Sequence, residues 1–147
     1  CVQTAKILFP RKDPCLISEF SECDFGKFEN KNYQELRNNP DYQKWLDSGG
    51  GLIFPGGESM VEFQERCLAG LEVVVAMAYE KDWKKIALIV HEGTIMTILG
   101  TYGFPPKDYF EWHVNNGEGY QVRFSAEAFY RGSRELVVDN KIVRSKK

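Results

Sequence analysis

No run of apolar residues in this sequence approaches the length of about 18 that a membrane-spanning helix requires. A strong charge of one sign is also missing, because 19 lysines and arginines stand against 21 aspartates and glutamates, a net charge of −2. Balanced charge gives no overall basic field that would attract nucleic acid, and the basic carboxyl-terminal segment KIVRSKK is short enough to be merely solvated. We therefore expect a soluble protein that binds neither membrane nor nucleic acid.

Metal-binding patterns are missing as well. Four cysteines occur, at Cys1, Cys15, Cys23 and Cys67. They show none of the paired spacings of zinc sites, and the sequence has only two histidines, which stand far apart. A chain of 147 residues, 43% of them hydrophobic, can bury a core without disulfides. We therefore expect reduced thiols in a cytoplasmic protein, with no metal and no other cofactor.

Apolar periodicity predicts a layered α/β domain. The sequence S-x-x-E at Ser59 and Glu62 is a capping box, and apolar residues recur every three or four positions for about five turns after it. Residues 86–90 form a near-continuous apolar strand, which is typical of a sheet covered on both faces, and residues 94–102 form the helix after it. Weaker patterns predict helices at residues 2–9, 33–38, 41–47 and 105–111, and strands at residues 15–18, 119–125 and 135–138.

The stretch IALIVHEGTIMTILG, residues 86–100, places His91 where the predicted strand ends and the next helix begins. Open α/β folds present groups to ligands at the carboxyl ends of their strands. Gly93 and Thr94 would lie at the start of the helix, where free backbone N–H groups suit an anion. A histidine in such a place is often only a structural hydrogen-bonding group, although it can also act as a base, a nucleophile or an anion partner.

The other chemically active side chains have simpler explanations when each is considered alone. His113 lies in EWHVNNGEG, beside Trp112 in a predicted surface turn. Glu58 and Ser59 are adequately explained by helix capping. The aromatic residues of the loops 24–58 and 103–118 are more often packing residues than substrate contacts, so they do not identify a substrate.

Four segments taken together resemble the histidine phosphatase superfamily, which is also called phosphoglycerate mutase-like, and especially its small bacterial phosphatases. The segments are CVQTAKILFP, SECDFGKFENK, FPGGES and IALIVHEGTI. They occur in the order of that family and at about its spacing, and they cover essentially the whole chain. The resemblance implies a three-layer α/β/α fold with a mostly parallel central sheet. We expect a single such domain over residues 1–147.

The resemblance also implies a reaction. In this family a histidine attacks a phosphomonoester, the phosphohistidine is hydrolysed without a metal, and further groups stabilise the charge on the phosphoryl oxygens. By resemblance, His91 matches the second, charge-stabilising histidine. Glu22 matches the acid that protonates the leaving oxygen, and partial burial or neighbouring charge would have to raise its pKa for that role. Ser59 matches a position in the wall of the site.

This sequence departs from the family pattern at two places. The Arg-His-Gly motif that carries the nucleophilic histidine does not occur, and the family has it on a first strand that would lie before residue 1. We therefore expect the domain to be incomplete at its amino terminus. Glu92 stands where the family generally has glycine, and its carboxylate would repel a phosphate dianion unless it turns away or meets a cation.

Three functions remain open from the sequence. The first is a phosphomonoesterase acting on a small phosphorylated metabolite. The second is a non-catalytic module that binds inorganic phosphate, a phosphorylated ligand or a protein partner. A phosphoglycerate-type mutase is a weaker third, because mutases of this family tend to carry longer insertions around the site. A homo-oligomer is also left open.

Overall fold

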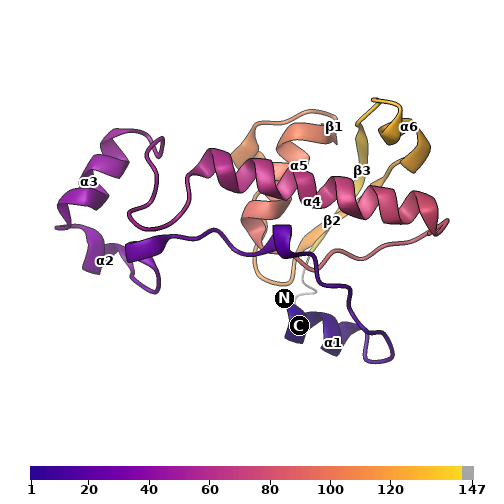
Figure 1. Ribbon diagram of the computed structural model, residues 1–147, viewed down its shortest axis with the longest axis horizontal. Coiled ribbons are helices and arrows are strands. Elements are labelled where there is room, and N and C mark those ends of the chain that lie inside the picture. Colours follow the sequence, from indigo (N-terminus) through magenta and orange to yellow (C-terminus); the bar gives the residue numbers. More distant parts are fainter. Residues whose placement is uncertain (144–147) are drawn as a thin grey trace. The chain divides into compact units, whose positions relative to one another are not determined.

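The computed structural model describes residues 1–143 of the chain (Figure 1). Its contacts divide the chain into two compact units: Cys1–Ser21 with Cys67–Lys147 forms one, and Glu22–Arg66 forms the other. No helix in the described part of the chain combines the length and the apolar character needed to cross a membrane.

The described residues form six α-helices, three strands and short 3₁₀ turns. The helices are α1 (Val2–Leu8), α2 (Tyr33–Leu36), α3 (Pro40–Asp47), α4 (Met60–Glu80), α5 (Glu92–Tyr102) and α6 (Ala126–Tyr130). The strands are β1 (Gly103–Phe104), β2 (Gly119–Arg123) and β3 (Leu136–Ile142). The 3₁₀ turns are Ser18–Phe20, Gly26–Phe28 and Tyr109–Trp112.

Side-chain caps fix the starts of several helices. The Ser59 hydroxyl accepts from the Glu62 N–H at 3.1 Å, and the Ser59 N–H donates to the Glu62 carboxylate at 2.8 Å, which confirms the predicted capping box ahead of α4. Asn32 caps α2 in the same reciprocal way. Asn39 caps α3, with Pro40 at the first helical position, where a missing N–H costs nothing.

The sheet has the strand order β1-β3-β2. β1 pairs with β3 in parallel over two residues, and β2 pairs with β3 antiparallel with an irregularity between Gln121 and Val122. The described residues are therefore a mixed α/β structure with one small sheet. The expected three layers and mostly parallel sheet are not confirmed, because the longer of the two strand pairings is antiparallel.

The predicted strand at residues 86–90 is not a strand in the structure. These residues lie between α4 and α5, and no β partner and no backbone hydrogen bond joins them to another described residue. Ile86 is 36% exposed and Leu88 is 38% exposed. Apolar character alone does not make a strand, since a strand needs a neighbour to pair its N–H and C=O groups.

The prediction for residues 15–18 was also wrong, because residues 15–17 have no regular secondary structure and the 3₁₀ turn Ser18–Phe20 follows. Two elements were not predicted, β1 and α6. β1 has only two residues, and α6 has five and depends on a cap in which the Ser125 hydroxyl accepts from the Ala128 N–H at 3.1 Å. Elements this short carry too little periodicity to be recognised in a sequence.

The hydrophobic core of the larger unit joins α4 and α5 to the sheet, and these elements lie beside one another in Figure 1. Its buried members are Leu71, Val75, Ile98, Leu99, Trp112, Phe129 and Leu136. Trp112 is fully buried, and a Cβ on Gly103 would come within 2.8 Å of its ring. The core therefore fixes α5, and with it the helix start that follows His91.

Candidate active site

His91 is the residue that immediately precedes α5. Its backbone is extended (φ −76°, ψ 159°), its carbonyl oxygen accepts the Ile95 N–H at 3.3 Å, and its side chain is partly exposed. An imidazole in this position stands beside the amino-terminal end of an 11-residue helix, whose first N–H groups have no acceptor within the helix. The arrangement suits an anion, which was the expectation for this stretch.

Gly93 and Thr94 lie in the first turn of α5, as predicted. The Thr94 side chain is fully buried, and its hydroxyl accepts from the Cys67 thiol at 3.6 Å. This contact joins α5 to α4 in the core. The hydroxyl of Thr94 is therefore a packing group, and its backbone N–H is the group that would meet a ligand.

Glu92 meets a potential cation. Its carboxylate contacts Nδ1 of His113, the only other histidine in the sequence. The Glu92 side chain is 40% exposed and the His113 side chain is 60% exposed. From the sequence, His113 has no assigned role and the orientation of Glu92 is open, and the structure pairs the two.

In the smaller unit, Glu22 lies at the beginning of the SECDFG segment. Its carboxylate accepts the Cys23 N–H at 3.0 Å. Glu22 is exposed, so the partial burial that we expected for a proton donor is not present. An exposed carboxylate is accessible to a substrate.

Ser59 lies at the end of GGES in the same unit. Besides accepting from the Glu62 N–H, its hydroxyl donates to the Glu62 carboxylate at 2.9 Å. The two hydrogen bonds from Ser59 lower the pKa of Glu62. The structure thus shows a capping role for Ser59, and its contact with a substrate stays a prediction.

Glu58 holds the SECDFG segment against the FPGGES segment. Its carboxylate accepts the Asp24 N–H at 2.8 Å, and its own N–H donates to the Asp24 carbonyl at 3.0 Å. Arg66, on α4, pairs with the same carboxylate at 2.6 Å and donates to the Glu22 carbonyl at 3.3 Å. The Arg66 hydrogen bond is the main reason that the pKa of Glu58 is lowered. Glu58 therefore positions the backbone beside Glu22.

Two glycines allow this close approach. Gly26 has φ +53°, and a Cβ there would lie 2.4 Å from the Pro55 carbonyl oxygen. A Cβ on Gly57 would lie 2.2 Å from the Asp24 carbonyl oxygen. Any side chain at either position would push the two segments apart, because these distances are shorter than real contacts.

Cys23, in the SECDFG segment, is buried. Burial, together with the nearby charges of Glu58 and Glu22, raises the pKa of the Cys23 thiol to about 12. A thiol with such a pKa stays protonated and is a poor nucleophile. Cys23 is therefore a packing residue, and none of the four cysteines, all of which lie in the described residues, forms a disulfide.

We expect the Glu58–Arg66 pair to make the protein sensitive to acid. Because the pKa of Glu58 is lowered in the folded state, the stabilisation is fully present above the ordinary value of 4.5 and is lost as the pH falls through the lower, folded-state pKa. Glu58→Gln should lower the free energy of unfolding by about 1 kcal/mol at neutral pH, and the difference from wild type should shrink at pH of about 3. Urea unfolding at both pH values measures this.

Glu65→Gln is the matched control, because Glu65 is an exposed glutamate on α4 in the same unit. It should leave the free energy of unfolding unchanged at both pH values. An equal loss in Glu58→Gln at neutral and acid pH would mean that the carboxylate charge is not what Arg66 recognises.

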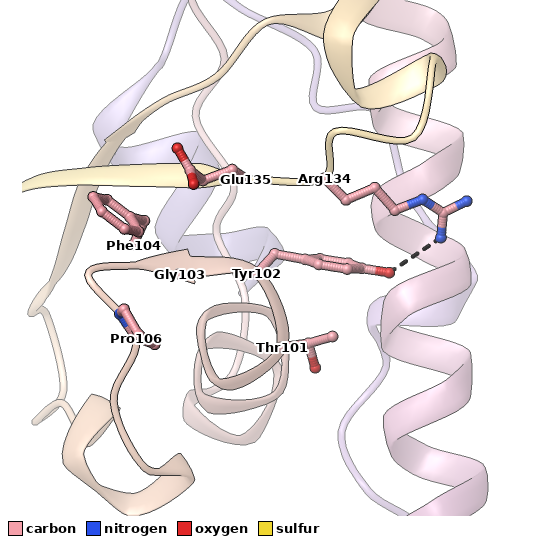
Figure 2. Close-up of a pocket in the computed structure, with 7 residues that line it drawn as sticks. All are labelled: Thr101, Tyr102, Gly103, Phe104, Pro106, Arg134 and Glu135. Carbon is pink, nitrogen blue, oxygen red and sulfur yellow. Dashed lines mark hydrogen bonds between the residues drawn. The ribbon is translucent and has the colours of Figure 1, made fainter.

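A pocket of about 250 Å³ opens at the other end of α5 (Figure 2). It is lined by Thr101, Tyr102, Gly103, Phe104, Pro106, Arg134 and Glu135. Arg134 donates to the Tyr102 hydroxyl at 3.2 Å and pairs with Glu72 at 2.6 Å. Because α5 rises about 1.5 Å per residue, this pocket lies about 15 Å along the helix from His91. None of the predicted site residues lines it.

No cluster of three or more histidine, cysteine, aspartate or glutamate side chains that could hold a metal ion occurs in residues 1–143.

The predicted site residues fall into two groups. His91, Gly93 and Thr94 belong to the larger unit, and Glu22 and Ser59 to the smaller one.

Sequence reasoning missed the role of Arg66, although a signal was present. Arg66 lies one helical turn after the capping residue Glu62, so both lie on one side of α4, near its beginning. No sequence pattern indicated the contact between Glu92 and His113, because that contact depends on where the turn after α5 places His113.

The geometry defines a mixed α/β protein whose candidate anion site lies at the start of a core helix, beside a histidine. A sequence profile of the histidine phosphatase superfamily (branch 1) matches residues 1–131. The chain therefore belongs to the histidine phosphatase superfamily, and membership indicates phosphatase- or mutase-type activity. Comparison with curated proteins and with solved structures found no match.

Proposed function

We propose that this protein is a phosphomonoesterase that hydrolyses a small phosphorylated metabolite through a phosphohistidine intermediate. The observation that supports the proposal best is the placement of His91: a partly exposed imidazole at the beginning of α5, in the segment that matches the superfamily. An imidazole and free helix N–H groups are suitable donors to the equatorial oxygens of a transferring phosphoryl group.

The proposed reaction has two steps. A histidine nitrogen attacks phosphorus, the bond between phosphorus and the ester oxygen breaks, and Glu22 gives its proton to that oxygen. A water molecule then attacks phosphorus, the bond between phosphorus and nitrogen breaks, and Glu22 takes the proton from the water. His91, the N–H groups of Gly93 and Thr94, and Ser59 hold the substrate. The attacking histidine is expected in an Arg-His-Gly motif ahead of residue 1.

The proposal also covers the fold of the domain and the compartment in which the protein works. The proposed domain has three layers and a mostly parallel sheet. None of the four cysteines forms a disulfide, which supports a reducing compartment such as the cytoplasm.

Trapping the intermediate tests the proposal. The full-length protein should hydrolyse p-nitrophenyl phosphate in the presence of a metal chelator. Rapid quenching of a reaction with radiolabelled substrate should leave phosphate on a histidine, in a bond that acid cleaves and base does not. Hydrolysis that stops with the chelator, or label on another residue type, would contradict the mechanism.

A phosphate-binding module without turnover is the alternative, and one observation favours it: the start of α5 beside His91 suits an anion whether or not a nucleophile attacks it. Such a module would bind inorganic phosphate in calorimetry and show no labelled intermediate. A mutase would move the labelled phosphoryl group to a second hydroxyl of the substrate without releasing it.

A further inference from the structure

The residue after His91 brings a negative charge to the place where a phosphoryl group is proposed to bind. Glu92 is the first residue of α5, and its carboxylate competes with an anionic ligand for the positive end of that helix. A carboxylate this close also repels a phosphate dianion directly. Something in the protein must offset this charge if the site is to bind phosphate.

His113 is placed to do so. Its Nδ1 contacts the Glu92 carboxylate, and the two residues come from segments far apart in the sequence. His113 follows the 3₁₀ turn Tyr109–Trp112, and the core fixes that turn because Trp112 is fully buried. The imidazole is 60% exposed, so it can exchange protons with solvent.

The other charged groups near His113 do not replace Glu92 as its partner. Lys141, on β3, donates to the backbone carbonyl of His113 at 2.9 Å and lies 3.7 Å from the Glu118 carboxylate. These contacts involve the His113 backbone and the pair Lys141–Glu118. The charge that meets the imidazole ring itself is that of Glu92 on α5.

We propose that His113 is a positioning residue for the phosphoryl group. In its protonated form the imidazole neutralises Glu92 and holds the carboxylate away from the ligand, so that His91 and the start of α5 can bind a dianion. Removing the imidazole leaves the Glu92 carboxylate uncompensated beside the ligand, and phosphate affinity falls. This inference rests on the proposed function, since it assumes that the phosphoryl group binds beside His91.

A double-mutant cycle on the full-length protein tests the proposal, with inorganic phosphate as the probe and calorimetry as the readout. His113→Gln keeps a hydrogen-bond donor but removes the charge, and it should weaken phosphate binding about tenfold at pH of about 6. Glu92→Gln should bind at least as tightly as wild type. In the Glu92→Gln background, His113→Gln should change the affinity less than twofold, because no carboxylate charge remains to be offset.

The charge itself can be tested by rescue. His113→Lys keeps a positive charge beside Glu92, so it should restore most of the affinity at pH of about 6 and at pH of about 8. Phosphate changes its own charge in this range, so variants are compared with one another at each pH. Glu127→Gln is the control, since it removes an exposed glutamate from α6 and should change nothing.

The possible outcomes separate this inference from the proposed function. An equal loss from His113→Gln in both backgrounds, or no loss in either, overturns the role of His113 even if the protein hydrolyses phosphomonoesters. Coupling in phosphate binding without hydrolysis supports His113 as a positioning residue and overturns the phosphomonoesterase. In an active protein, His113→Gln should raise KM more than it lowers kcat.

Discussion

Replacing His91 by alanine should lower kcat/KM for p-nitrophenyl phosphate about 100- to 1,000-fold in the full-length protein. This is the usual loss when one preorganised donor to a developing oxyanion is removed. The Thr94 hydroxyl cannot replace His91, because it is fully buried against Cys67. The remaining helix N–H groups would still bind phosphate weakly. Steady-state kinetics of purified wild-type and variant proteins measure the change.

A folding defect would imitate this loss, so the unfolding midpoint is compared in parallel. The His91 side chain is partly exposed and lies outside the core cluster, so the midpoint should hardly change. His91→Asn offers a second comparison, because its amide can donate one hydrogen bond. Its activity should fall between that of wild type and that of His91→Ala. Wild-type activity in His91→Ala would remove His91 from the mechanism.

The long helices could be predicted because their signals are local. The capping box at Ser59 and the apolar stripe after it identify α4. Six members of that stripe are buried as expected: Phe63, Cys67, Leu71, Val74, Val75 and Ala78. The prediction for residues 86–90 failed because a strand depends on partners elsewhere in the chain. Val, Ile and Leu indicate a buried strand only when a neighbouring strand is present to pair with it.

The candidate site was predictable in part for the same reason. The position of His91 before α5 follows from local pattern, since an apolar run ends there and a helix begins. The burial of Thr94 and the exposure of Glu22 depend on tertiary packing, which the sequence does not reveal. The pairing of Glu92 with His113 depends on the turn that Trp112 fixes in the core. Local sequence thus predicted where the site residues lie, and packing determined their partners.

Glu22→Gln should lower the hydrolysis of alkyl phosphates about 100- to 10,000-fold, which is the range that general acid and base catalysis contributes. An alkoxide is a poor leaving group, so it needs a proton as its bond to phosphorus breaks. Glutamine has nearly the same shape but no proton to give. The Cys23 N–H can still donate to the amide oxygen of glutamine, so the backbone of the segment should stay in place.

A comparison of two leaving groups shows whether Glu22 acts as an acid or only supports the fold. The p-nitrophenolate ion leaves readily without a proton, so Glu22→Gln should slow p-nitrophenyl phosphate much less than an alkyl phosphate, whereas a structural defect would slow both equally. Glu65→Gln, an exposed change in the same unit, should slow neither. A Glu22→Gln variant with equal losses on the two substrates would show that the proton comes from another group. The ratio of the two losses therefore measures proton donation independently of how well each variant folds.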